Sequence, residues 1–180
     1  MKENYYEKLL NINTAGNENW NKTSPHNHPY QPTLYEALDT LFEKYDLDED
    51  DHIVDFGSGK GRIVFYINHF FRCYANGVEM NEIYYNESLL NKSKYIQKHK
   101  KMEDKVNFYC NLSQNYNVEE KDNKFYFFNY YVRRSIIGFI VYFRQIASPI
   151  NQVIFTVSGC ITIFPEKINC KIKFVRVYCD

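Results

Sequence analysis

The sequence has no excess of charge of either sign and no long apolar run, and each absence argues against a class of partner. Its 22 lysines and arginines balance 22 aspartates and glutamates, which gives a formal net charge of zero at pH 7. A neutral chain has no overall attraction to nucleic acid or to acidic lipid. The most apolar segment, residues 136–143, is far too short to cross about 30 Å of hydrocarbon. We therefore expect no membrane span, and we do not expect a nucleic-acid partner.

The five cysteines stand at scattered positions, and none forms a C-x-x-C pair. This usage is typical of a reduced, cytoplasmic protein and argues against a disulfide framework or a zinc site. His26 and His28 form a close pair without a third ligand type nearby, so we interpret them as part of a surface loop and expect no metal. The first residues lack the apolar run of a signal peptide.

The length of 180 residues is that of one domain with a proper core. Residues 1–32 are polar and irregular in pattern, and we interpret them as an N-terminal extension of a domain that spans residues 33–180. Residues 130–180 are atypical, because they contain few acids against seven lysines and arginines.

The segment HIVDFGSGKGR, residues 52–62, combines a strand, a turn and the start of a helix. Its apolar first half predicts a buried strand, which runs into Gly57, Gly59 and Gly61. An apolar pattern with helical spacing begins at Arg62. Glycines at such a turn permit positive φ and bring the backbone close to a ligand. The order is that of the first half of a nucleotide-binding βαβ unit.

The glycine spacing excludes two common nucleotide motifs. A dinucleotide fingerprint would have its third glycine at Arg62, and a P-loop would have serine or threonine where Gly61 follows Lys60. A second short strand, residues 77–79, ends at Glu79. A carboxylate at this place can accept hydrogen bonds from both hydroxyls of a ribose. Glycine turn and acid together would suit S-adenosylmethionine or a nicotinamide cofactor.

The run Val-Asp-Phe-Gly-Ser-Gly-Lys-Gly-Arg, residues 54–62, resembles the first motif of class I S-adenosylmethionine-dependent methyltransferases. The resemblance implies an α/β fold, a Rossmann-like three-layer sandwich around a mostly parallel sheet of seven strands. It also implies methyl transfer from S-adenosyl-L-methionine to an acceptor, either a protein side chain or a small molecule. The residues that it places at the cofactor are Thr33, Tyr35, Asp55, Gly57, Ser58, Gly59, Gly61, Glu79, Met80 and Asn111.

The resemblance also assigns roles to these residues. The turn would contact the methionine part, Asp55 would support the turn or the amino group, and Glu79 would bind the ribose. Asn111, at the end of a third strand over residues 106–110, would accept from the adenine amino group through its side-chain oxygen. The segment that contains Thr33 and Tyr35 would fold over the methionine end.

For Thr33 and Tyr35 the residues themselves offer another interpretation. Thr33 and Glu36 match a capping box, in which Thr33 is the N-cap of a helix and Tyr35 is a core aromatic. A later helix, from an Asn81 cap to about Lys100, would place Ile83, Leu89, Leu90 and Ile96 inward.

The chemistry-bearing motif of the family would follow a fourth strand, residues 124–129, at Asn129, Tyr130 and Tyr131. These three are catalytic candidates by position, although the expected proline is missing. Asn129 could orient a nucleophile, but its amide cannot act as a general base. A simple turn at the end of the strand is the alternative.

Beyond residue 130 the resemblance is poor. Residues 152–157 read as a fifth strand, and 161–164 with 171–178 read as a hairpin, so no room remains for the helix between the fifth and sixth strands. We expect a C-terminal part that is divergent, truncated or rearranged. Two other functions stay open: a module that binds S-adenosylmethionine without turnover, and a nicotinamide-dependent oxidoreductase that uses Glu79 for the ribose.

Overall fold

A computed structural model describes residues 2–16 and 30–127 of the chain. The histidine pair, the catalytic candidates Asn129, Tyr130 and Tyr131, and the strands expected after residue 150 lie outside the described residues. The division into an extension and a domain at residue 33 therefore stays a prediction.

The described residues contain a parallel sheet with the strand order β3-β2-β1-β4. The strands are β1 (His52–Phe56), β2 (Tyr74–Glu79), β3 (Val106–Cys110) and β4 (Lys124–Phe127). The chain leaves β1 for β2 on one side, and later reaches β4 on the other side of β1. Ligands bind where the strand order reverses in this way, at the carboxyl ends of the strands. The predicted Rossmann-like α/β fold is confirmed, with four strands in the described part of the chain.

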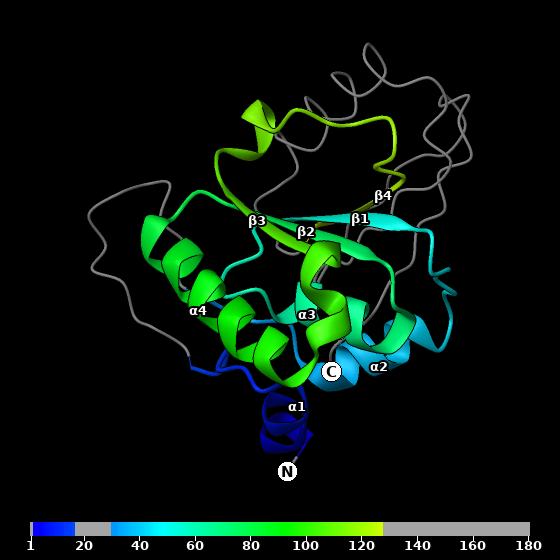
Figure 1. Cartoon of the computed structure of the whole chain (residues 1–180), viewed down its shortest axis with the longest axis vertical. Coiled ribbons are helices and arrows are strands. Elements are labelled where there is room, and N and C mark those ends of the chain that lie inside the picture. Colours follow the sequence, from blue (N-terminus) through cyan, green and yellow to red (C-terminus); the bar gives the residue numbers. More distant parts are fainter. Residues whose placement is uncertain (1, 17–29, 128–180) are drawn as a thin grey trace, which may run out of the picture.

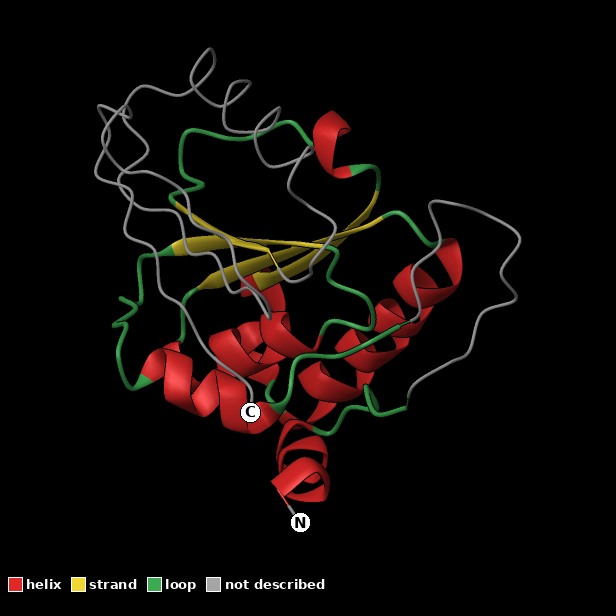
Figure 2. Ribbon diagram, turned by 180° about the vertical axis from the view of Figure 1, so that it is seen from behind, coloured by secondary structure: helices red, strands yellow, loops and turns green. Residues whose placement is uncertain are grey.

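Four α-helices lie together on one side of the sheet (Figure 1). They are α1 (Lys2–Leu10), α2 (Tyr35–Phe42), α3 (Arg62–Phe71) and α4 (Glu82–Lys98). Two short 3-10 helices are η1 (Lys100–Lys105) and η2 (Ser113–Asn115), and the chain around η2 crosses the opposite side of the sheet (Figure 2). No helix in the described ranges is long and apolar enough to cross a membrane.

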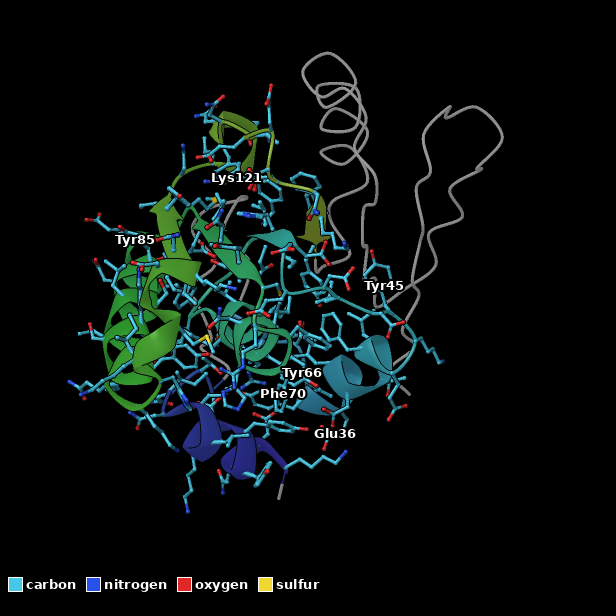
Figure 3. All side chains as sticks on the ribbon, turned by 45° about the vertical axis from the view of Figure 1, so that its right-hand side comes forward. Glu36, Tyr45, Tyr66, Phe70, Tyr85 and Lys121 are labelled. Atoms are coloured by element: carbon cyan, nitrogen blue, oxygen red, sulfur yellow. The ribbon has the colours of Figure 1, made fainter. Side chains whose placement is uncertain are left out.

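The core lies between the helices and the sheet and is rich in aromatic side chains. Tyr66 of α3 is buried near α2 and lies beside the half-exposed Phe70, with ring centroids 4.7 Å apart (Figure 3). Phe65 is fully buried and packs on Phe108 of β3 at 5.4 Å between centroids. Each such side chain contributes on the order of 1.5–3 kcal/mol when it is fully buried. This packing holds α3, and with it the glycine turn that precedes it, firmly on the sheet.

The start of α2 differs from the predicted capping box. The helix begins at Tyr35, its N-cap is Leu34, and no side chain caps it. Thr33 instead lies buried, and its Oγ1 is 3.2 Å from the hydroxyl of Tyr126 in β4. The capping-box prediction is wrong because a partner on the sheet, 93 residues away in sequence, takes the hydroxyl.

The buried face of α4 also differs from the prediction. The Asn81 cap is confirmed, since its Oδ1 accepts from the Ile83 N–H at 2.9 Å. However, Ile83 and Leu90 are 56% and 63% exposed, and Leu89 is exposed as well. The buried residues of the helix are Tyr84, Ser88, Asn91 and Tyr95. Asn91 is buried because it bonds the main-chain oxygens of Asn13 and Lys60, which require hydrogen-bonding partners. Ser88 bonds Tyr85 O within the helix, and Tyr95 packs on Phe65.

Residues 2–10 form helix α1, where the sequence predicted an irregular segment with a short amphipathic turn at Tyr5, Leu9 and Leu10. The helix docks on α2, where Asp39 accepts from Lys2 Nζ at 3.2 Å and from the Tyr6 hydroxyl at 2.6 Å. Leu10 at its end is fully buried in the core. The first residues of the chain are thus packed against the same helices that support the sheet.

Candidate functional site

The glycine turn leaves the carboxyl end of β1, the strand between β2 and β4. Gly57, Gly59 and Gly61 have φ angles of 83°, 54° and 90°, which favour glycine over residues with a side chain. The Gly57 N–H donates to Val78 O at 2.8 Å, and the Gly61 N–H donates to Ser58 O at 2.8 Å. The turn is therefore a fixed structure that is anchored to the end of β2.

Added side chains would collide at Gly59 and Gly61 of the turn, whereas a Cβ atom at Gly57 would meet nothing within 4 Å. A Cβ atom at Gly59 would lie 2.6 Å from a ring carbon of Tyr30. A Cβ atom at Gly77, in β2, would lie 2.7 Å from Ser58 Oγ and 2.6 Å from the ring of Phe108. Contacts this short would force the neighbouring side chains to move, so the packing favours glycine at these positions.

Glu79 closes the site from the end of β2, as the sequence predicted by position. Its Oε2 accepts from the Gly59 N–H at 2.8 Å, and its Oε1 accepts from the Asn81 N–H at 2.8 Å. Burial raises the pKa of Glu79, and these backbone donors oppose the rise. The carboxylate therefore connects the glycine turn to the start of α4.

Two buried polar side chains at the carboxyl end of β1, Asp55 in the strand and Ser58 in the turn, lack a compensating partner among the described residues. Burial, followed by the negative charge of Glu79, raises the pKa of Asp55 well above its ordinary value. No hydrogen bond or cation from the described residues offsets that rise. Ser58 Oγ is likewise buried and has no hydrogen-bond partner in the described part of the chain. Asp55 pairs in register with Gly77, the residue that Ser58 Oγ covers, so the two groups are close neighbours.

At the end of β3 the structure brings Asn111 next to Glu79. The Asn111 N–H donates to Glu79 O at 3.0 Å, and its side-chain oxygen accepts from the Leu112 N–H at 2.9 Å. Met80 and Leu112 follow the ends of β2 and β3, and both are exposed apolar side chains. The sequence analysis did not identify Leu112. Its place directly after Asn111 was the signal that could have indicated it.

Thr33 and Tyr35 lie in different surroundings. Thr33 reaches Tyr126, which pairs in register with Asp55, so Thr33 lies on the Asp55 side of the site. Tyr35 is fully buried, and its hydroxyl donates to Glu7 of α1 at 2.8 Å. The structure therefore brings Thr33, but not the hydroxyl of Tyr35, toward the glycine turn.

Sequence reasoning also missed the contacts that surround the turn from outside. Lys60 is buried, lies 2.9 Å from Glu87 of α4, and has its Nζ 4.9 Å from the ring centre of Tyr30. Arg62 is buried and donates from Nε to Thr14 Oγ1 at 2.7 Å and from Nη1 to Thr33 O at 3.0 Å. Charged residues directly beside the glycines were a signal, but their partners lie too far away in sequence to be inferred.

A turn of this shape at the central strand, with Glu79 and Asn111 at the ends of the next two strands, defines a class of protein, the class I S-adenosylmethionine-dependent methyltransferases. The family described as "Histone methylation protein DOT1" matches residues 8–131, which is more than half of the chain. The chain belongs to this family and is an S-adenosylmethionine-dependent methyltransferase. The cofactor of the chain is therefore the one of this family, S-adenosylmethionine.

Solved structures share the fold at low identity. An RNA methyltransferase from Salinibacter ruber, in complex with S-adenosyl-L-homocysteine, has a TM-score of 0.55 and 21% identity, over 66% of this chain and 72% of that one. YjhP from E. coli has a TM-score of 0.53 and 17% identity, over 69% of this chain and 49% of that one. The chain thus spans about half the length of YjhP. A search of curated proteins found no match.

Proposed function

We propose that the chain binds S-adenosylmethionine at the carboxyl ends of β1, β2 and β3 and transfers its methyl group to a protein side chain. The match to a histone-methylation family across residues 8–131 carries this proposal, because it covers the glycine turn, Glu79 and Asn111. The cofactor supplies a methyl group that its sulfonium has already activated. The protein must then hold acceptor and methyl group in line, an effect worth up to about 7–11 kcal/mol.

Asp55 and Ser58 fit the ammonium group of the methionine part. A buried carboxylate without a cation and a buried hydroxyl without a partner are both costly, and an ammonium with three donors would satisfy them together. The N–H groups of Gly57, Ser58, Gly59 and Gly61 already donate within the protein. We therefore assign to the turn close approach to the cofactor, and to Asp55 and Ser58 its polar recognition.

Glu79 fits the ribose diol without giving up its present bonds. The carboxylate accepts from the N–H groups of Gly59, Asn81 and Met80, and two oxygens with about four lone-pair directions leave room for a hydroxyl. Asn111 has the same kind of spare capacity for the adenine amino group, since its oxygen accepts one N–H. Met80 and Leu112 offer apolar surface for the adenine ring on either side.

The choice of acceptor and the catalytic residues remain predictions. We infer a protein acceptor from the description of the family, and we retain Asn129, Tyr130 and Tyr131 as the residues that orient it. An amide oxygen at Asn129 could accept from an amine and direct its lone pair toward the methyl group. It could not remove a proton, so the amine must arrive neutral.

The test is transfer of a tritiated methyl group from S-adenosylmethionine to a cell extract, with Glu79→Ala as the variant without cofactor binding. Label in the protein fraction, absent with Glu79→Ala, is the expected result. Label in the small-molecule fraction alone would overturn the protein acceptor. Cofactor binding without label in any fraction would favour a module that binds without turnover.

A further inference from the structure

Residues 11–16, which we name the N-terminal strap, are tied to the glycine turn by one side chain of α4. Asn91 accepts from the Asn13 N–H at 2.9 Å, and its Nδ2 donates to Asn13 O and to Lys60 O, each at 3.1 Å. Asn91 is only 3% exposed. An amide offers two donors, and here one is used on the strap and one on the turn.

Thr14 forms a second joint between the strap and the turn. Its Oγ1 accepts from Arg62 Nε at 2.7 Å, and its carbonyl accepts from the Tyr30 hydroxyl at 2.8 Å. Its N–H donates to Glu7 of α1 at 2.6 Å. Thr14 is fully buried, and its bonds to Arg62 and Tyr30 are shielded from water.

The two joints act on neighbouring residues of the turn. Lys60 and Arg62 lie on either side of Gly61, and each is held to the strap, the first through Asn91 and the second through Thr14. Thr14 also anchors the Tyr30 ring, which lies on Gly59. A displacement of the strap would take Thr14 away from Arg62 Nε and from the Tyr30 hydroxyl. It would also remove Asn13 from Asn91, the side chain that holds Lys60 O. The position of the strap therefore helps to fix the position of the turn.

We propose that Asn91 is a positioning residue that couples docking of the N-terminal strap to cofactor binding at the glycine turn. This inference rests on the proposed cofactor site. Coupling of this kind is reciprocal, so the docked strap raises cofactor affinity by the same factor by which the cofactor protects the strap. A typical coupling changes affinity by about 5–150-fold.

The test measures S-adenosylhomocysteine affinity by calorimetry and backbone hydrogen exchange of residues 2–16 with and without that ligand. Asn91→Asp keeps the acceptor and removes both donors. Asn68→Asp is the matched control, because Asn68 is equally buried, donates to Cys73 O at 2.9 Å and accepts from Tyr95 at 2.8 Å, away from the turn. Both substitutions lower the melting temperature.

The expected result separates the two variants. Wild type and Asn68→Asp bind the ligand with equal affinity, and the ligand slows exchange in residues 2–16 of both. Asn91→Asp binds at least about fivefold more weakly, and ligand at saturation no longer slows exchange in residues 2–16. If Asn91→Asp does not fold, Tyr30→Phe, which removes the hydroxyl that donates to Thr14 O and is bonded by the Lys60 backbone, is expected to weaken binding and to abolish the ligand's effect on exchange in residues 2–16.

Two results would overturn the coupling. One is ligand binding by wild type without slower exchange in residues 2–16. The other is equal affinity in Asn91→Asp and Asn68→Asp, which would leave Asn91 with a purely structural role. A folded wild type that does not bind the ligand at all would overturn the proposed function itself, which is a distinguishable outcome.

Discussion

Asp51 and Asp55 lie at opposite ends of β1, are both buried, and have opposite surroundings. Asp51, just before the strand, pairs with Lys124 and accepts from Asn123 Nδ2 at 3.0 Å and from the Asp48 N–H at 2.7 Å. Asp55, near the end of the strand, has a raised pKa because of burial and the charge of Glu79, with no described group to offset it.

This difference separates the part of the sheet that is built for stability from the part that is built for a ligand. A buried charge without a partner costs free energy, and proteins retain such a group where a ligand completes it. The neighbouring Ser58 hydroxyl adds a second unsatisfied group at the same end. In the described part of the chain, Asp122 Oδ1, ahead of β4, is also buried without a partner, but the other oxygen of that carboxylate accepts from the Tyr116 hydroxyl and the Glu119 N–H. At the carboxyl end of β1 a carboxylate and a hydroxyl lie together, an arrangement that a positively charged ligand would complete.

The largest expected effect comes from breaking the ion pair at the amino end of β1. Lys124→Met leaves the Asp51 carboxylate buried without its cation, and we expect a loss of about 3–5 kcal/mol in the free energy of unfolding. Urea denaturation measures the loss, and calorimetry should show unchanged affinity for S-adenosylhomocysteine in the folded variant. Asp51→Asn combined with Lys124→Met should recover part of the stability. A clear loss of affinity would show that the ion pair at the amino end of β1 also affects ligand binding at its carboxyl end.

At the carboxyl ends of the strands, Glu79→Gln should weaken cofactor binding. Because Glu79 accepts two backbone N–H bonds and is assigned to the ribose, we expect a loss of about 1.5–3 kcal/mol in binding of S-adenosylhomocysteine. Calorimetric titration gives the affinity. The exposed Glu120 offers a matched control, and Glu120→Gln should leave affinity unchanged. Equal affinity in the two variants would remove Glu79 from the site.

Asp55→Asn should stabilise the free protein while it weakens the site. The folded pKa of Asp55 is raised, so its carboxyl favours the fold most at low pH, and this contribution is lost as pH rises from about 3.9 through the folded pKa. We expect the variant to be about 1–3 kcal/mol more stable at pH 7, with a smaller decline of stability toward high pH. Thermal unfolding across pH measures both. A variant that is less stable than wild type at pH 7 would contradict the assignment.

The smallest expected effect is that of a substitution at Asn81. This residue caps α4 next to the proposed cofactor site, but we assign it no contact with the cofactor. Asn81→Ala removes the side-chain acceptor of the Ile83 N–H at the start of α4 and should cost about 1 kcal/mol of stability. Its N–H still donates to Glu79, so affinity for S-adenosylhomocysteine should change little. Urea denaturation and calorimetry on one preparation test this, and a large loss of affinity would give the cap a direct role in the site.

The parts of the fold that the sequence predicted are those governed by local pattern. The strand before the glycine turn, the helix from Arg62 and the third strand over residues 106–110 follow from apolar spacing and from glycines that need positive φ. The acid at Glu79 follows from its place at a strand end.

The parts that could not be predicted depend on partners far away in sequence. Asn91 is buried because it serves Asn13, 78 residues away, and the Thr33 hydroxyl is taken by Tyr126, 93 residues away. Helical spacing favoured Leu90 for the buried face of α4, but the main-chain groups beneath the helix required an amide. The roles of the cofactor residues and of Asn129, Tyr130 and Tyr131 stay predictions.

Calorimetric titration of the folded chain with S-adenosylhomocysteine, beside NADH and the Asp55→Asn variant, tests the central claim most directly. We expect saturable binding of S-adenosylhomocysteine at one site, weaker binding by Asp55→Asn, and no binding of NADH. A folded protein that binds neither ligand, or an Asp55→Asn variant with full affinity, would contradict the claim that the unsatisfied end of β1 is the cofactor site.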